Sequence, residues 1–167
     1  MAHGYRRTDL DIHVGDLARL AGCSPDAGVG LLTAAPVSAM HTVIDTAASV
    51  TATVGVRIPT WAAAPTASVE VPVGTINLVA WVPEPLSPAA LVNLVATITE
   101  AKTQALFERG VPGTGTASDA VCVTCPVGRP AVGAASQFGG PRSVWGARIA
   151  RAAHAAVLAG LADEGST

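Results

Sequence analysis

The chain has 167 residues, enough for one domain with a sizeable hydrophobic core. Half of the residues are hydrophobic and 13% are charged, which excludes an intrinsically disordered chain, and the net charge of −2 excludes a general basic field for nucleic acid. The polar N-terminus lacks the apolar run of a signal peptide, and no uncharged span is long enough to cross a bilayer. We therefore expect a cytoplasmic protein with no nucleic-acid or membrane partner. The low share of charged residues further predicts a homo-oligomer.

The N-terminal half is predicted to mix helices and strands. The expected elements are an amphipathic helix over residues 11–21, a strand over 29–33, a helix over 36–45, a strand over 49–56, a proline-rich loop over 59–72 and a buried strand over 75–82. The helix over 36–45 is inferred from Pro36, since proline is common in a first helical turn. The strand over 49–56 is inferred from alternating valine and threonine.

The C-terminal half begins with a strong helix signal. Ser87 and Pro88 form an N-cap followed by proline at the first helical position, and Gly110 ends the helix after residue 109. Further elements are a buried strand over residues 120–125, a strand over 131–137 and a last helix over 143–161. The order predicts one mixed β-sheet with packed helices, an α/β or α+β single domain over residues 1–167. Residues 1–10 and 162–167 are expected to be flexible termini.

A polar loop lies between the long helix and the strand that follows it. Residues 113–119, Gly-Thr-Gly-Thr-Ala-Ser-Asp, place three hydroxyls and a carboxylate between two apolar elements. One interpretation is a loop that binds an anion or a polarised carbonyl, with Thr116 or Ser118 as nucleophile and Asp119 as base or orienting carboxylate. The simpler interpretation is a tight turn in which Asp119 caps backbone amides. A nucleotide P-loop is excluded, because the loop follows a helix and lacks the Gly-Lys-Ser/Thr ending.

Other polar residues give weaker signals. Glu100 lies among apolar residues of the long helix and could act as a general acid/base, although a solvated helix face explains it as well. Lys102 is two residues away, so the pair does not share a helix face. Arg142, in the Gly-Gly-Pro-Arg segment, faces either an anion or only a helix-entry turn. The scattered histidines and a Cys-x-x-Cys on a strand do not form a metal site, and we expect neither metal nor cofactor.

Five segments of the sequence form a recognisable set. They are Val-Gly-Leu-Leu-Thr-Ala-Ala at 29–35, Gly-Thr-Ile-Asn at 74–77, Thr-Glu-Ala-Lys-Thr at 99–103, Gly-Thr-Gly-Thr-Ala-Ser-Asp-Ala-Val at 113–121, and Gly-Gly-Pro at 139–141 before a helix with Gly146. Together they resemble the adenosylcobinamide amidohydrolase family. The resemblance implies hydrolysis of the amide that joins aminopropanol to the corrin ring of adenosylcobinamide, so the expected partner is a small corrinoid substrate. The product would be adenosylcobyric acid, in cobamide salvage.

If the chain has this activity, the chemistry of the residues suggests roles for several of them. Thr114, Thr116 and nearby backbone amides are candidates for an oxyanion cradle, Glu100 or Asp119 for the base, and Lys102 for charge stabilisation. The residues expected to bind substrate are Asn77, Thr33, Thr114, Ser118 and Arg142.

The chain departs from the family pattern in its N-terminal part. The family usually has a longer portion before the Val-Gly-Leu-Leu-Thr-Ala-Ala segment than the 28 residues here, and the stretch over 53–61 also looks atypical. This departure leaves open two alternatives to hydrolysis of adenosylcobinamide. One is an enzyme recruited to another small substrate, and the other is a non-catalytic small-molecule-binding protein.

Overall fold

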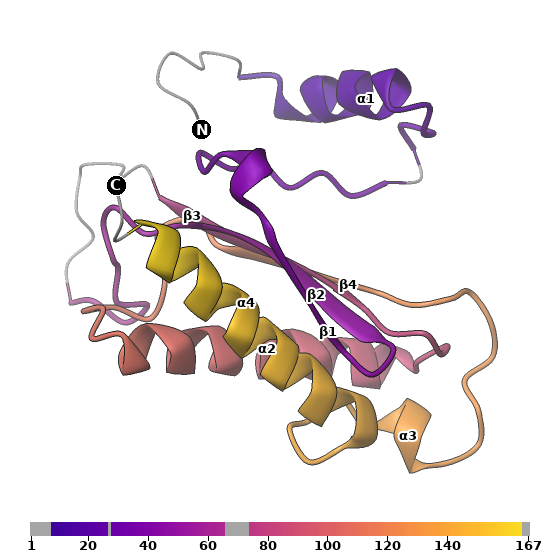
Figure 1. The fold of residues 1–167 in the computed structure, drawn as a ribbon. Helices are drawn as coiled ribbons and strands as arrows, with labels where there is room; N and C mark the ends of the chain where they lie inside the picture. The colour runs from indigo at the N-terminus through magenta and orange to yellow at the C-terminus, as the bar shows by residue number, and fades with distance from the viewer. Residues whose placement is uncertain (1–7, 27, 66–73, 165–167) are drawn as a thin grey trace.

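The computed structural model describes residues 8–26, 28–65 and 74–164 (Figure 1). Its elements are helix α1 (Leu10–Leu20), the 3-10 turn η1 (Val37–Ala39), strands β1 (His41–Asp45), β2 (Ala48–Gly55) and β3 (Thr75–Trp81), helix α2 (Pro88–Glu108), strand β4 (Ala120–Thr124), the short helix α3 (Ala134–Gln137) and helix α4 (Val144–Glu164). These elements confirm the prediction of one mixed sheet with packed helices.

The described strands form one sheet in the order β1-β2-β3-β4. β1 pairs antiparallel with β2 and β2 with β3, whereas β4 lies parallel to β3. A parallel pair needs a long crossover, and α2 supplies it between β3 and β4. The N-terminal ends of β3 and β4 therefore lie side by side at one end of the sheet, with Asn77 opposite Ala120.

The core lies between one face of the sheet and helices α2 and α4 (Figure 1). Alternate strand residues point to the helices and are fully buried: Ala48, Val50 and Ala52 on β2, and Ile76, Leu78 and Ala80 on β3. They meet Leu94, Ile98, Ala105 and Leu106 of α2 and Ile149, Ala152, Ala153, Ala156 and Val157 of α4. The many alanines bring the helices close to the sheet.

The opposite face of the sheet carries polar and partly exposed residues. Val79 and Trp81 on this face are 41% and 42% exposed. Helix α1 and the segment after it lie on this side, away from α2 and α4 (Figure 1). Asn77 donates a hydrogen bond from Nδ2 to the Leu32 carbonyl at 2.9 Å, which ties that segment to β3.

Three predicted elements are wrong. Residues 29–33 are not a strand, and residues 36–45 contain η1 and β1 instead of a helix. The reason is a β-hairpin: β1 pairs with β2 through a turn in which Thr46 has a φ of 64°. Residues 131–137 hold α3 rather than a strand, and none of the described strands pairs with the free side of β4, which is the edge of the sheet.

The long helix forms as its sequence predicts. The Ser87 side chain accepts a hydrogen bond from the Ala90 amide at 3.1 Å, and Pro88 occupies the first turn. Just beyond the C-terminus, Gly110 has a φ of 68°, a left-handed conformation that favours glycine. Both ends of α2 are thus fixed by local chemistry.

The C-terminal end of α2 is tied to α4 by a carboxylate. Glu108 bonds with His154 at 2.8 Å and accepts a hydrogen bond from Gln104 at 2.8 Å. Mainly the Gln104 bond, and then the His154 bond, hold the pKa of Glu108 below its ordinary value. A lowered pKa in the folded state means that the unfolded chain binds more protons in acid.

We expect the Glu108→Gln variant to lose part of the acid sensitivity of the wild type. The Glu108 contribution is present above the ordinary glutamate pKa of about 4.3 and is lost as the pH falls through the lowered pKa. Denaturant midpoints between about pH 3 and pH 7 measure this, with the exposed Glu100→Gln on the same helix as control. A Glu108→Gln curve parallel to that of the wild type would contradict the expectation.

Candidate active site

The polar loop before β4 is held by the carboxylate of Asp119. Its Oδ1 accepts hydrogen bonds from the Ile76 amide at 2.9 Å and the Thr116 hydroxyl at 2.5 Å. Its Oδ2 accepts from the Thr116 amide at 3.1 Å and from Lys102 Nζ at 2.5 Å. The carboxylate therefore joins the loop to β3 and α2 at once.

The Lys102–Asp119 ion pair is almost fully enclosed. The two side chains are 7% and 13% exposed. Since a carboxylate offers about four acceptor positions, the four hydrogen bonds leave little capacity for a substrate proton. The geometry thus favours a positioning role for Asp119, and its backbone contacts match the turn-capping interpretation.

Gly115 leaves the space that this ion pair needs. A Cβ atom at this position would collide with Asp119 Oδ2 and would lie 2.5 Å from Lys102 Nζ. Any larger residue must therefore separate the buried pair or shift the loop.

We expect Gly115→Ala to lower the free energy of unfolding by about 1–3 kcal/mol, because overpacking displaces charged groups that cannot reach water. Urea denaturation measures the change. Gly28→Ala is the matched control, since a Cβ there meets nothing closer than 4.0 Å. Equal stability of the two variants would show that the loop is not tightly packed around the pair.

The other end of the loop pairs with the segment around Thr60. Thr114 donates its amide to the Thr60 carbonyl at 2.9 Å, and Thr60 donates its amide to the Gly115 carbonyl at 2.8 Å. The Thr114 hydroxyl accepts from the Ala62 amide at 2.9 Å. Thr114 is therefore engaged in holding the loop.

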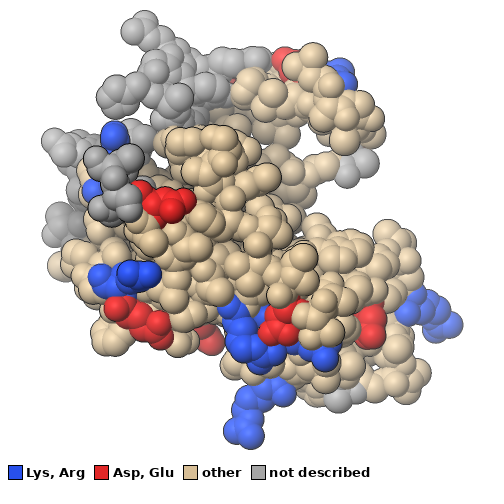
Figure 2. All heavy atoms as spheres, viewed as in Figure 1, with Lys and Arg blue, Asp and Glu red and all other residues tan. Residues whose placement is uncertain are grey.

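A cavity of about 670 Å³ lies between α1 and the N-terminal ends of β3 and β4. Figure 2 shows the molecule hollowed between α1 and the rest of the chain. The cavity is lined by Leu10, Asp11, Val14, Gly15, Pro25, Gly30, Leu31, Leu32, Gly74, Thr75, Asn77, Ser118 and Ala120. Its walls are mainly apolar, with a small group of polar side chains, as is usual for a small-molecule site.

The polar group comes from β3 and the loop. The Thr75 and Ser118 hydroxyls lie 2.8 Å apart, and the Ser118 hydroxyl also lies 3.1 Å from the Gly74 carbonyl. These distances allow two arrangements of the hydroxyl protons. If the Ser118 hydroxyl donates to the Thr75 hydroxyl, the Thr75 proton is free for a ligand. If the Ser118 hydroxyl donates to the Gly74 carbonyl, the Thr75 hydroxyl donates to Ser118. Asn77 lies two residues further along β3 and is 6% exposed.

The predicted site residues separate into groups. Asn77 and Ser118 line the cavity, while Lys102, Thr114 and Thr116 support the loop beside it. Thr33 lies next to the lining segment, where its hydroxyl accepts from the Ala35 amide at 3.1 Å.

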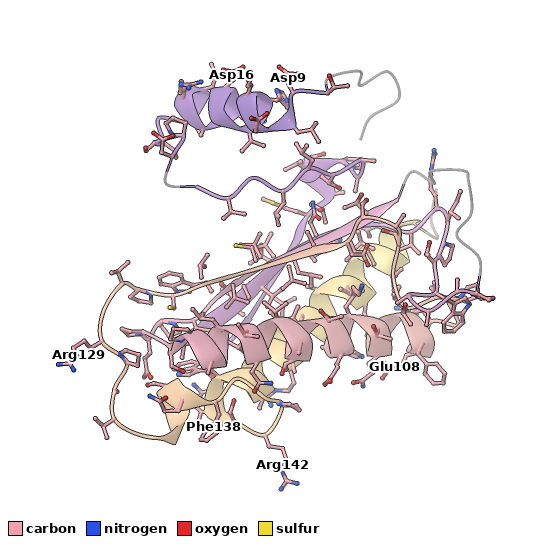
Figure 3. The ribbon with its side chains drawn as sticks, turned by 180° about the vertical axis from the view of Figure 1, so that it is seen from behind. Asp9, Asp16, Glu108, Arg129, Phe138 and Arg142 are labelled. Atoms are coloured by element: carbon pink, nitrogen blue, oxygen red, sulfur yellow. The ribbon has the colours of Figure 1, made fainter. Side chains whose placement is uncertain are left out.

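Two predicted residues are not brought to the cavity. Glu100 is exposed on α2, which covers the opposite face of the sheet. Arg142 is exposed as well and points away from the molecule on the side opposite α1 (Figure 3).

The sequence interpretation missed Asp11 as a site residue. Among the described residues that line the cavity, Asp11 is the only ionisable one. The available signal was an acidic residue in the first turn of an amphipathic helix, which is also common on solvated helices. Only the placement of α1 over the end of the sheet singles it out.

Within the described parts of the chain, no group of three or more His, Cys, Asp or Glu residues could hold a metal ion. None of the helices described is long and apolar enough to span a bilayer.

A family model for adenosylcobinamide amidohydrolase (CbiZ) matches residues 1–167. The chain belongs to the adenosylcobinamide amidohydrolase family. The curated adenosylcobinamide amidohydrolase of Halobacterium salinarum is 42% identical over 91 residues. That match spans 54% of this chain and 37% of the relative. No solved structure matches the chain.

Three motifs that resemble the adenosylcobinamide amidohydrolase family converge on the cavity. Residues 30–32 come from the first motif, Gly74, Thr75 and Asn77 from the second, and Ser118 and Ala120 from the fourth. Lys102, from the third, supports the fourth through Asp119. Segments far apart in the sequence thus build one pocket and its support.

Proposed function

We propose that the chain hydrolyses the amide that joins aminopropanol to the corrin ring of adenosylcobinamide, releasing adenosylcobyric acid and aminopropanol. The observation that carries this proposal is the convergence of three family motifs on one cavity with hydroxyl and carboxamide groups at its floor. Family membership and the Halobacterium salinarum relative support the substrate class.

The cavity residues suggest how the reaction would proceed. A water molecule attacks the amide carbon and gives its proton to the Asp11 carboxylate, while the Thr75–Ser118 hydroxyl pair donates to the carbonyl oxygen as negative charge develops. The carbon–nitrogen bond then breaks, and the proton held by Asp11 passes to the leaving nitrogen. The acid product loses a proton that the free amine takes up, so atoms and charge balance.

The geometry of the loop leads to different roles for three of the predicted residues. Lys102, Thr116 and Asp119 are proposed to position the loop rather than to transfer protons. A catalytic role for Glu100 and substrate binding by Thr33, Thr114 and Arg142 stay predictions.

The proposal is tested by incubating the purified chain with adenosylcobinamide and analysing the mixture by liquid chromatography and mass spectrometry. Adenosylcobyric acid and free aminopropanol are the expected products. Unchanged substrate, while the Halobacterium salinarum relative converts it in parallel, would reject the proposal. Corrinoid absorbance retained after desalting would then favour a binding protein, and its loss would favour another substrate.

We expect Asp11→Asn to lower kcat by about 10²-fold, the usual contribution of a positioned general base. Asp11→Glu should recover part of the rate, because it restores a carboxylate. Asp16→Asn is the matched control on α1, since Asp16 pairs with Arg19 at 3.0 Å and does not line the cavity. Undiminished turnover by Asp11→Asn would remove Asp11 from the reaction.

A further inference from the structure

Among the described residues, only one of the two polar atoms of the Asn77 side chain has a hydrogen-bond partner. Its Nδ2 donates to the Leu32 carbonyl at 2.9 Å, which fixes the orientation of the amide. Its Oδ1 is buried and has no hydrogen-bond partner among the described residues. A buried acceptor without a donor is destabilising, and Asn77 lines the cavity, so this oxygen calls for a functional explanation.

The position of Asn77 indicates which donor would fit. Thr75 and Asn77 both line the cavity and lie on the same face of β3, two residues apart. Such residues repeat about every 6.6 Å along a strand. A trans secondary amide presents its carbonyl and its N–H in opposite directions. The donor that binds its carbonyl and the acceptor that binds its N–H are therefore separated by a distance similar to this repeat. The spacing of Thr75 and Asn77 along β3 therefore suits the two ends of such an amide.

A second buried polar atom lies on the neighbouring strand. The hydroxyl of Thr53 has no hydrogen-bond partner among the described residues, and Thr53 is opposite Asn77 in the register of β2 and β3. Because these atoms are buried, a ligand reaches Asn77 Oδ1 only with a local shift of the groups around it.

We propose that Asn77 Oδ1 accepts the N–H of a secondary amide whose carbonyl is held by the Thr75–Ser118 hydroxyl pair. This inference rests on the proposed function and adds to it a basis for specificity. An ester of the same shape has an oxygen atom where the amide has N–H, so it offers no donor and places two acceptors against each other. The site would therefore select amides that carry an N–H and discriminate against esters.

The experiment compares adenosylcobinamide with the ester analogue in which oxygen replaces the amide nitrogen. The amide-to-ester ratio of kcat/KM is measured for the wild type and for Asn77→Leu. The quotient of interest is the wild-type ratio divided by the Asn77→Leu ratio, because this division cancels the intrinsic reactivity of the ester. We expect a quotient of at least about ten, because the site loses a hydrogen bond made only with the amide. Asn93→Leu, on the outer side of α2, is the control and should give a quotient near one.

Equilibrium binding separates this inference from the proposed function. If the wild type hydrolyses neither compound, the proposed function fails, and calorimetric dissociation constants then test the inference. Binding of the amide at least about tenfold tighter than the ester supports it. Equal binding of the two compounds, no binding of either, or a quotient within twofold of one overturns it. The wild-type comparison also keeps the test valid if Asn77→Leu fails to fold.

Discussion

Replacing Lys102 with methionine will lower the free energy of unfolding by about 3 kcal/mol or more. The substitution keeps most of the side-chain volume but leaves the Asp119 carboxylate, 13% exposed, without its cation. Removal of one partner from a buried ion pair usually costs about 3–5 kcal/mol, because the remaining charge is neither paired nor hydrated. Because three other hydrogen bonds to Asp119 remain, we expect a loss of stability near the lower end of this range. Urea denaturation of the two proteins measures the difference.

The double variant Lys102→Met/Asp119→Asn distinguishes the ion pair from the packing of lysine alone. Because it removes both charges, it should be destabilised by less than the sum of the two single variants. Additive effects would contradict the account of the loop as an element held by this pair. Residual hydrolysis by folded Asp119→Asn would support a positioning role for Asp119, since a required base would leave almost none.

The double variant Thr75→Val/Ser118→Ala should lower kcat/KM for adenosylcobinamide by about 10²–10³-fold. Thr75→Val preserves shape, and together the substitutions remove the hydroxyls, 2.8 Å apart, that are proposed to donate to the developing oxyanion. Loss of one oxyanion-hole donor typically has an effect of this size. Because the interaction is strongest in the transition state, the loss should appear mainly in kcat. Steady-state kinetics with product detection by mass spectrometry gives both parameters.

Thr124→Val provides the control for this variant. Thr124 lies near the far end of β4, and its hydroxyl bonds the Ala80 carbonyl at 2.9 Å rather than facing the cavity. Its kcat/KM should stay close to that of the wild type. A rate for Thr75→Val/Ser118→Ala within a few-fold of this control would show that the hydroxyl pair does not take part in the reaction.

Much of the central fold could be predicted because its signals are local. Ser87, Pro88 and Gly110 specify the ends of α2 through caps and backbone preference. The alternation of valine and threonine indicates β2, and a continuous apolar run indicates β3. The prediction of a helix over 36–45 fails because Pro36 favours a helix start, whereas the pairing of β1 with β2 depends on residues further along the chain.

The site was harder to predict, since its contacts join distant segments. The loop sequence indicated polar chemistry, but the Asp119 bond to the Ile76 amide spans 43 residues. The same holds for Asp11, which lines the cavity only because α1 lies over the ends of β3 and β4. Sequence periodicity shows that α1 is amphipathic, but it does not show which surface the helix covers.

A crystal structure of the chain with adenosylcobyric acid, the proposed product, would show directly whether the cavity is the active site. We expect the product carboxylate to lie in the cavity, with one oxygen within hydrogen-bond distance of the Thr75–Ser118 pair and the released-amine side toward Asn77. Binding of the product elsewhere, for example beside Glu100 on the α2 face, would contradict the assignment of this cavity as the active site.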